Sequence, residues 1–182
     1  MADKSNSANA YLVDGNITTL FIPDGGIKDI SKPTVEELSA PTAINLSPWL
    51  TLADGFALTH DQNTVNDDRE AWSSVGTIPA SDSYSNTTMR IINNVNKGED
   101  VPNVAYQTLK RNTKGFIVRR RGKAYDAPFA AGDEVAVYKV TIGIVVPVAA
   151  AQNTRQMSTV HFSVDPSSKE EGEAKVVDGV KA

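Results

Sequence analysis

Alternation of apolar and polar residues is the strongest pattern in this sequence, and it predicts a chain built mainly of β-strands. Residues 157–164 alternate cleanly, with valine and phenylalanine on one face and threonine, histidine and serine on the other. Residues 86–95 alternate in the same way, which predicts a strand with one dry face and one wet face. The longest apolar run, Glu134–Val146, predicts the centre of a sheet, and shorter β-rich runs occur at Ile17–Ile22 and Phe116–Arg121.

One stretch has helical spacing instead. Asp100 is a suitable N-cap, and Pro102 sits just inside the expected start, where its missing N–H is harmless. Val101, Val104, Ala105 and Leu109 then form an apolar stripe, basic residues crowd the last turn, and Gly115 can provide a left-handed C-cap. The sequence therefore predicts one capped helix that packs against the sheet. A shorter signal, the capping-box spacing of Thr34 and Glu37, predicts a single helical turn.

The remaining segments are expected to be turns, loops and tails. Residues 49–59 suggest two short strands around a turn at Asp54-Gly55. Residues 60–85 are polar and lack a sustained period, so we expect a long loop there. Residues 1–10 are expected to be a flexible arm, and the charged residues 165–182 an unpacked C-terminal tail.

The length of 182 residues suits one domain, which we place at residues 11–164. Six to eight strands and one main helix predict a mainly β fold, either a β-sandwich or a partly open barrel with one flanking α-helix.

Composition narrows the function classes. The net charge of −4 argues against a protein that neutralises nucleic-acid phosphates, and the absence of cysteine excludes disulfides and thiolate chemistry. The most apolar run, residues 140–151, is too short to span a bilayer, and no secretory signal is evident, so we expect a soluble protein made in a cytoplasm. No nucleophile, zinc or phosphate-loop motif is present, although paired carboxylates could still meet in the fold. We expect no enzyme, no cofactor and no metal.

Two local patterns resemble binding sites but have simpler explanations. Asp61-Gln62-Asn63 opens like a calcium loop, but Val65, Asn66 and Trp72 occupy positions where that loop needs other residues. The three arginines at 119–121 resemble a nucleic-acid patch, yet alternate side chains of a strand point to opposite faces. Salt bridges across strands or between subunits are the simpler interpretation of these arginines.

Four stretches, in this order, resemble one known family: LFIPDGGIKDISKPTVEELSAP, LTLADGFALTHDQNTVND, AYQTLKRNTKGFIVRRRG and APFAAGDEVAVYKVTIG. They resemble the major tail (tail tube) proteins of long-tailed, non-contractile bacteriophages (siphophages), especially those of Gram-positive hosts. The resemblance implies a β-sandwich with one flanking helix that forms hexameric rings. The stacked rings make the tail tube of the virion, through which DNA enters the host. It also implies assembly in the host bacterial cytoplasm with tape measure, tail terminator and distal tail or baseplate proteins as partners.

Physical arguments agree with that role. Free strand edges can be closed by pairing with neighbouring subunits, and a DNA channel should be polar without binding phosphate tightly. The candidate lumen-facing residues are Thr88, Arg90, Asn94, Thr159, His161 and Ser163. The candidate residues for contacts between subunits or rings are Asp61, Asp67, Asp68, Arg69, Glu70, Trp72, Arg119 and Arg121. We expect the segment 60–85 to reach a neighbouring subunit or ring. The alternative function is a monomeric β-sandwich module for adhesion or carbohydrate binding.

Overall fold

The computed structural model describes residues 11–97 and 101–179, and its eight strands form one antiparallel sheet that is not closed into a barrel. The strands are β1 (Ile17–Pro23), β2 (Ile44–Asn45), β3 (Phe56–Asp67), β4 (Gly76–Ile92), β5 (Lys114–Arg121), β6 (Glu134–Pro147), β7 (Met157–Val164) and β8 (Lys169–Lys175). The helical elements are α1 (Val35–Leu38), the 3₁₀ turn η1 (Ser47–Trp49) and α2 (Val104–Thr108). The strand order is β2-β1-β5-β6-β7-β4-β3, and β8 also pairs with β6. The prediction of a mainly β fold with few helices is confirmed. The arm expected at residues 1–10 lies outside the described residues.

The sheet has a hydrophobic core on each face. The first face carries the larger cluster, in which strands β4 to β7 pack against Leu109 and Ala105 of the α2 region. The second face carries a smaller cluster over β1, β5 and the first half of β6, covered by Leu38 of α1 and by Val176 near the C-terminus. The predicted centre of the sheet is therefore correct, because residues 135–138 of β6 are buried on both faces.

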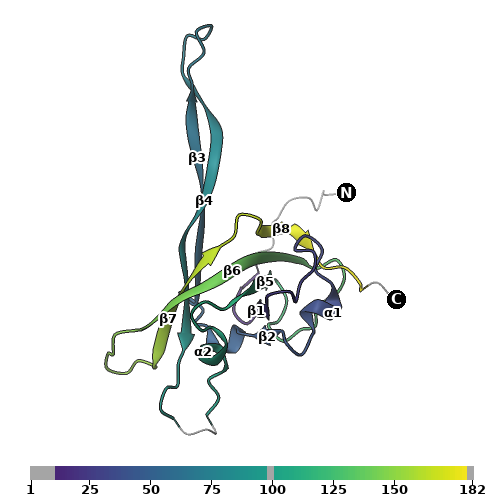
Figure 1. The fold of residues 1–182 in the computed structure, drawn as a ribbon, viewed down its shortest axis with the longest axis vertical. Coiled ribbons are helices and arrows are strands. Elements are labelled where there is room, and N and C mark those ends of the chain that lie inside the picture. The colour runs from purple at the N-terminus through teal and green to yellow at the C-terminus, as the bar shows by residue number, and fades with distance from the viewer. Residues whose placement is uncertain (1–10, 98–100, 180–182) are drawn as a thin grey trace, which may run out of the picture.

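The segment expected to be a long loop, residues 60–85, is a β-hairpin. In Figure 1 β3 and β4 form a two-stranded ribbon that rises far from the body of the molecule. Their register runs from Phe56 opposite Met89 to Asp67 opposite Gly76, with two irregularities on the way. The prediction failed because almost every side chain of the ribbon beyond residue 58 is exposed, so the sequence there carries no buried face and no alternation.

The predicted helix is much shorter than expected. It begins at Val104 after Asn103 and ends before Leu109, and Gly115 lies in β5 rather than at a C-cap. The sheet ends the helix, because the Asn112 N–H donates to the Ile142 carbonyl at 2.8 Å. The Ile142 N–H in turn donates to the Thr113 carbonyl at 2.8 Å. Asp100, the predicted N-cap, lies outside the described residues.

Two further expectations are wrong, and one is confirmed. The 3₁₀ turn η1 ends at Trp49, and residues 50–55 form turns instead of a short strand, in which Gly55 packs directly against the backbone of Thr51. The charged tail is not unpacked: β8 pairs with β6, and Ala174 is buried in the second core. The sequence does not reveal this strand, because most of its side chains are charged. The capping box at Thr34 is present, since both of its hydrogen bonds form with Glu37.

Candidate assembly surfaces

The tip of the hairpin combines acidic and apolar side chains in solvent. Asp68 and Glu70 are exposed and form no ion pair within the described residues, whereas Asp67 is paired with Arg69 at 2.8 Å. The Trp72 side chain is 59% exposed, and the Arg69 guanidinium lies 5.9 Å from its ring centroid. Three more apolar side chains of this region are exposed: Val65, Val75 and Ile78. Exposing so many large apolar side chains together is unfavourable for a monomer, so the tip has the character of a contact surface.

The base of the hairpin is fixed to the body by a polar cluster. His60 Nε2 lies 2.8 Å from Asp82 Oδ2 and its Nδ1 lies 3.3 Å from Glu170 Oε1, while its ring stacks on Tyr84 at 4.2 Å. Burial, followed by the nearby carboxylates of Glu170 and Asp82, raises the pKa of Tyr84. The Tyr138 hydroxyl also donates to Glu170 at 2.7 Å. These contacts join the ribbon to the start of β8 and to β6, and so set the direction in which the hairpin projects.

A cleft of about 340 Å³ opens beside the start of the hairpin. Its lining residues are Val13, Asp14, Gly15, Ile17, Thr19, Ser47, Pro48, Leu50, Thr51, Leu52, Phe56, Arg119 and Tyr125, and we call it the Arg119 groove. The Arg119 guanidinium stacks on the Phe56 ring at 4.1 Å. Burial lowers the pKa of Arg119 below the ordinary arginine value, which means that its charge is poorly solvated. The groove is therefore a cleft of mixed apolar and polar lining that contains one partly desolvated cation.

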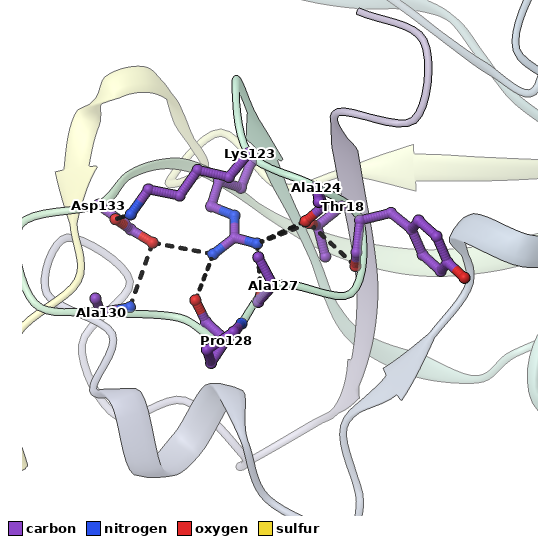
Figure 2. Close-up of polar contacts among 9 residues, drawn as sticks. Thr18, Lys123, Ala124, Ala127, Pro128, Ala130 and Asp133 are labelled. Atoms are coloured by element: carbon purple, nitrogen blue, oxygen red, sulfur yellow. Dashed lines mark hydrogen bonds and ion pairs between the residues drawn. The ribbon is translucent and has the colours of Figure 1, made fainter.

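The neighbouring Arg120 points to the opposite face, where its guanidinium lies 4.3 Å from the Phe129 ring centroid, and it is buried. Figure 2 shows the groups that accept its hydrogen bonds, among them Thr18, Pro128 and Asp133. Arg120 donates to Asp133 Oδ2 at 3.0 Å, to the Thr18 hydroxyl at 3.1 Å, and to three backbone carbonyls. Those carbonyls belong to Ala124, Ala127 and Pro128 in the connection between β5 and β6. This connection also carries Tyr125, whose N–H donates to the Gly15 carbonyl at 2.9 Å and whose side chain lines the Arg119 groove. Arg120 thus holds the loop that builds one wall of that groove.

Most of the candidate lumen residues share one surface, on the second face of the sheet. Thr88 is opposite His161, Arg90 is opposite Thr159, and Ser163 is opposite Thr141. Directly opposed residues point to the same side of a sheet. We call these six residues the wet face, because all of them remain at least partly exposed. Asn94 is separate, since it follows the end of β4 and its side chain donates to the Pro102 carbonyl at 3.4 Å.

Charge on the wet face is largely balanced. Arg90 is paired with Asp54. Lys139, which lies on the same side of β6 as Thr141, is 3.8 Å from Asp165. The surface is polar but offers few unpaired cations to a polyanion.

The structure separates the candidate contact residues into two groups. Asp67, Asp68, Arg69, Glu70 and Trp72 lie at or beside the hairpin tip, and Asp61 lies along the ribbon, where it accepts a hydrogen bond from Ser85 at 2.6 Å. Arg119 lines the groove on the body, and Arg121 is paired with Glu171, with 2.7 Å between Nε and Oε2. Alternation along the strand is visible in the sequence, but the burial of Arg120 is not, because all of its partners except Thr18 follow it in a loop without regular pattern.

Within residues 11–97 and 101–179, no group of three or more histidine, aspartate or glutamate side chains is arranged to hold a metal. No helix in the same part of the chain is long and apolar enough to cross a membrane.

Comparison with known proteins places these surfaces in context. No curated protein matches the chain. A solved structure, the cryo-EM structure of the anti-feeding prophage (AFP) baseplate, 6-fold symmetrised, contains a chain with the same fold at a TM-score of 0.50 and 6% identity. The match covers 87% of this chain and 94% of that one. The family model described as "phage tail tube protein" matches residues 5–177. The chain therefore belongs to the phage tail tube protein family and is a structural component of a phage tail.

Proposed function

We propose that copies of this chain assemble into stacked hexameric rings, and that the resulting tube conducts DNA into a host bacterium. The hairpin is the observation that carries this proposal. It is a long two-stranded ribbon whose side chains beyond its base are almost all exposed. An isolated two-stranded ribbon is at best marginally stable in water, so contacts with other copies would supply the burial that it lacks.

The outer edge of the sheet supports the same proposal. Within the described residues, β3 pairs only with β4, so the other edge of this strand is free. A free edge of this length is a ready template for another strand. The opposite end of the sheet is blunted, because β2 is only two residues long. Ring closure would cover free backbone groups by pairing them with the next subunit, as happens when a sheet closes into a barrel.

We assign the wet face to the channel. It is contiguous across β4, β7 and β6, and it is rich in hydroxyl groups. Because Arg90 and Lys139 are already paired with carboxylates, the surface would make only transient, non-specific contact with DNA. The tube would be built in the host cytoplasm with tape measure, tail terminator and distal tail or baseplate proteins.

A shortened hairpin tests the proposal. Gln62 and Asp82 are opposed in the register, so replacing residues 63–81 by Asn-Gly closes the ribbon with a two-residue turn. This variant keeps the His60–Asp82 contact at the base of the hairpin. Light scattering would give the mass of each protein in solution, negative-stain microscopy would show rings or tubes, and circular dichroism would confirm that both proteins are folded.

We expect rings or tubes from the full-length chain at high concentration and a folded monomer from the shortened variant. Normal tubes from the shortened variant would show that the hairpin has no part in assembly. A full-length chain that stays monomeric at millimolar concentration would refute self-assembly and favour the monomeric adhesion or carbohydrate-binding module.

A further inference from the structure

We propose that the hairpin tip of one copy docks in the Arg119 groove of another copy, with a tip carboxylate on the Arg119 guanidinium. The proposal rests on the proposed function, since it concerns contacts inside the tube, but it names a receptor site that the assembly alone does not specify.

The charge in the groove favours the binding of an anion. Within residues 11–97 and 101–179, Arg119 forms no ion pair, and its buried Nε has no hydrogen-bond partner. The neighbouring Glu171 is already engaged by Arg121. Asp14 also lines the groove, but it is exposed and forms no ion pair in the same part of the chain. A carboxylate that entered the groove would meet a guanidinium already stripped of much of its water, where a charge-assisted hydrogen bond is strongest.

Some of the apolar side chains that line the groove are also largely exposed to solvent. Leu52 is 61% exposed and Tyr125 is 41% exposed, and both line the cleft. The floor and walls also include Pro48, Leu50 and Phe56. A ligand that fits this surface needs an acidic group beside an apolar or aromatic one.

The hairpin tip has this combination. Asp68 and Glu70 have no ion-pair partner within the described residues, and they flank the exposed Trp72 on its N-terminal side. The tip residues 67–70 include three acids and one base, so their net charge is opposite to that of Arg119. Docking would place a carboxylate against Arg119 and would remove the Trp72 ring from water.

The position of the groove means that each tip-to-groove contact links one copy to a different copy. Phe56 lines the groove and is also the first residue of β3, so groove and tip lie at opposite ends of the same ribbon. Twelve residues of strand span about 40 Å at roughly 3.3 Å per residue. A tip cannot reach its own groove without unfolding the ribbon. A tip-to-groove contact is therefore head-to-tail, and in a tube it would join successive copies, either around a ring or from one ring to the next.

The absence of cysteine from the chain allows a clean cross-linking test. The variant Leu52→Cys/Glu70→Cys carries one thiol in the groove and one at the tip, both at exposed positions. Under mild oxidation we expect a ladder of disulfide-linked multimers on non-reducing gels. The matched control, Lys110→Cys/Glu70→Cys, has its second thiol at an exposed site outside the groove and should not form the ladder. Absence of a ladder from Leu52→Cys/Glu70→Cys, in a preparation that forms tubes, would overturn the proposal.

Charge reversal provides a second test that does not depend on cysteine geometry. Asp68→Lys/Glu70→Lys alters only the exposed tip and should reduce tube length at least tenfold, while Glu36→Lys/Asp178→Lys, two exposed acids elsewhere, should leave tubes unchanged. Combining Asp68→Lys/Glu70→Lys with Arg119→Glu should restore tubes. Normal tubes from the tip variant would refute the docking contact but leave the proposed function intact, whereas a wild-type chain that forms no rings or tubes would count against the proposed function itself.

Discussion

Replacing Arg120 by methionine should destabilise the fold more than any exposed substitution in the chain. The change keeps a long side chain but removes five hydrogen bonds to the loop after β5 and to Thr18. It also leaves the Asp133 carboxylate, 7% exposed, with Lys123 at 2.5 Å as its remaining cation. Removing one partner of a buried ion pair costs about 3–5 kcal/mol. For a chain of this size that corresponds to a melting temperature lower by about 10 °C.

The pH dependence of this loss follows from the pKa of Asp133. Burial alone would raise that pKa, but hydrogen bonds from Lys123 and Arg120 outweigh burial and hold it below the ordinary value of 3.8. A carboxyl group with a lowered folded-state pKa stabilises the fold fully above its unfolded pKa and loses that contribution as the pH falls through the folded value. The difference in stability between wild type and Arg120→Met should therefore be complete at neutral pH and should shrink below about pH 4.

Guanidinium unfolding followed by circular dichroism, at several pH values, would measure both effects. Arg155→Met, at an exposed position, is the control and should stay within about 0.5 kcal/mol of wild type. A double-mutant cycle with Asp133→Asn should show a clear coupling energy, because the two side chains interact directly. A loss below about 1 kcal/mol for Arg120→Met, or strictly additive effects in the cycle, would refute the argument that this ion pair holds the loop.

Two further substitutions test the packing of the turn before β3 and the assignment of the wet face. Gly55→Ala should lower the melting temperature by several degrees, because a Cβ there would lie 2.0 Å from the Thr51 carbonyl oxygen. Gly76→Ala is the matched control, since its Cβ would meet only Asp67 at 3.9 Å. Equal melting temperatures of the two variants would contradict the expected clash. Thr88→Lys/Thr159→Lys should leave tube assembly intact but slow DNA release from assembled phage, because the added cations would bind phosphates. The rate of release can be measured by the fluorescence of a dye that binds the ejected DNA. Release at the wild-type rate would exclude the wet face as the channel lining.

The parts of the fold that sequence predicts well are those in which each strand has its own buried face. Strand β7 has the predicted bounds, because Val160 and Phe162 are buried and His161 and Ser163 are exposed. The capping box at Thr34 is equally local, since both of its bonds join residues three positions apart. In these places the sequence contains the whole physical cause of the structure.

Where the cause lies elsewhere in the chain, local pattern misleads. Residues 101–115 carry helical signals, yet the helix stops after Thr108 because Asn112 and Thr113 bond to Ile142 in β6. Likewise, three consecutive arginines give no sign that Arg120 is buried and Arg119 partly so. Three of the five groups that accept hydrogen bonds from Arg120 are backbone carbonyls, which have no signature in a sequence.

The hairpin is a third case, in which the missing cause lies outside the single chain. Residues 60–85 were expected to be a loop because no face of the ribbon is buried, and the structure confirms that exposure while showing a regular strand pair. A ribbon that buries nothing in its own subunit is stabilised mainly by its backbone ladder, which is weak in water. The exposed Trp72, Val75 and Ile78 would contribute most if another copy covered them. The residues whose structure cannot be predicted from a single chain would then be the residues that are buried only when many chains assemble. Amide hydrogen exchange of residues 60–85 should therefore slow markedly on tube formation.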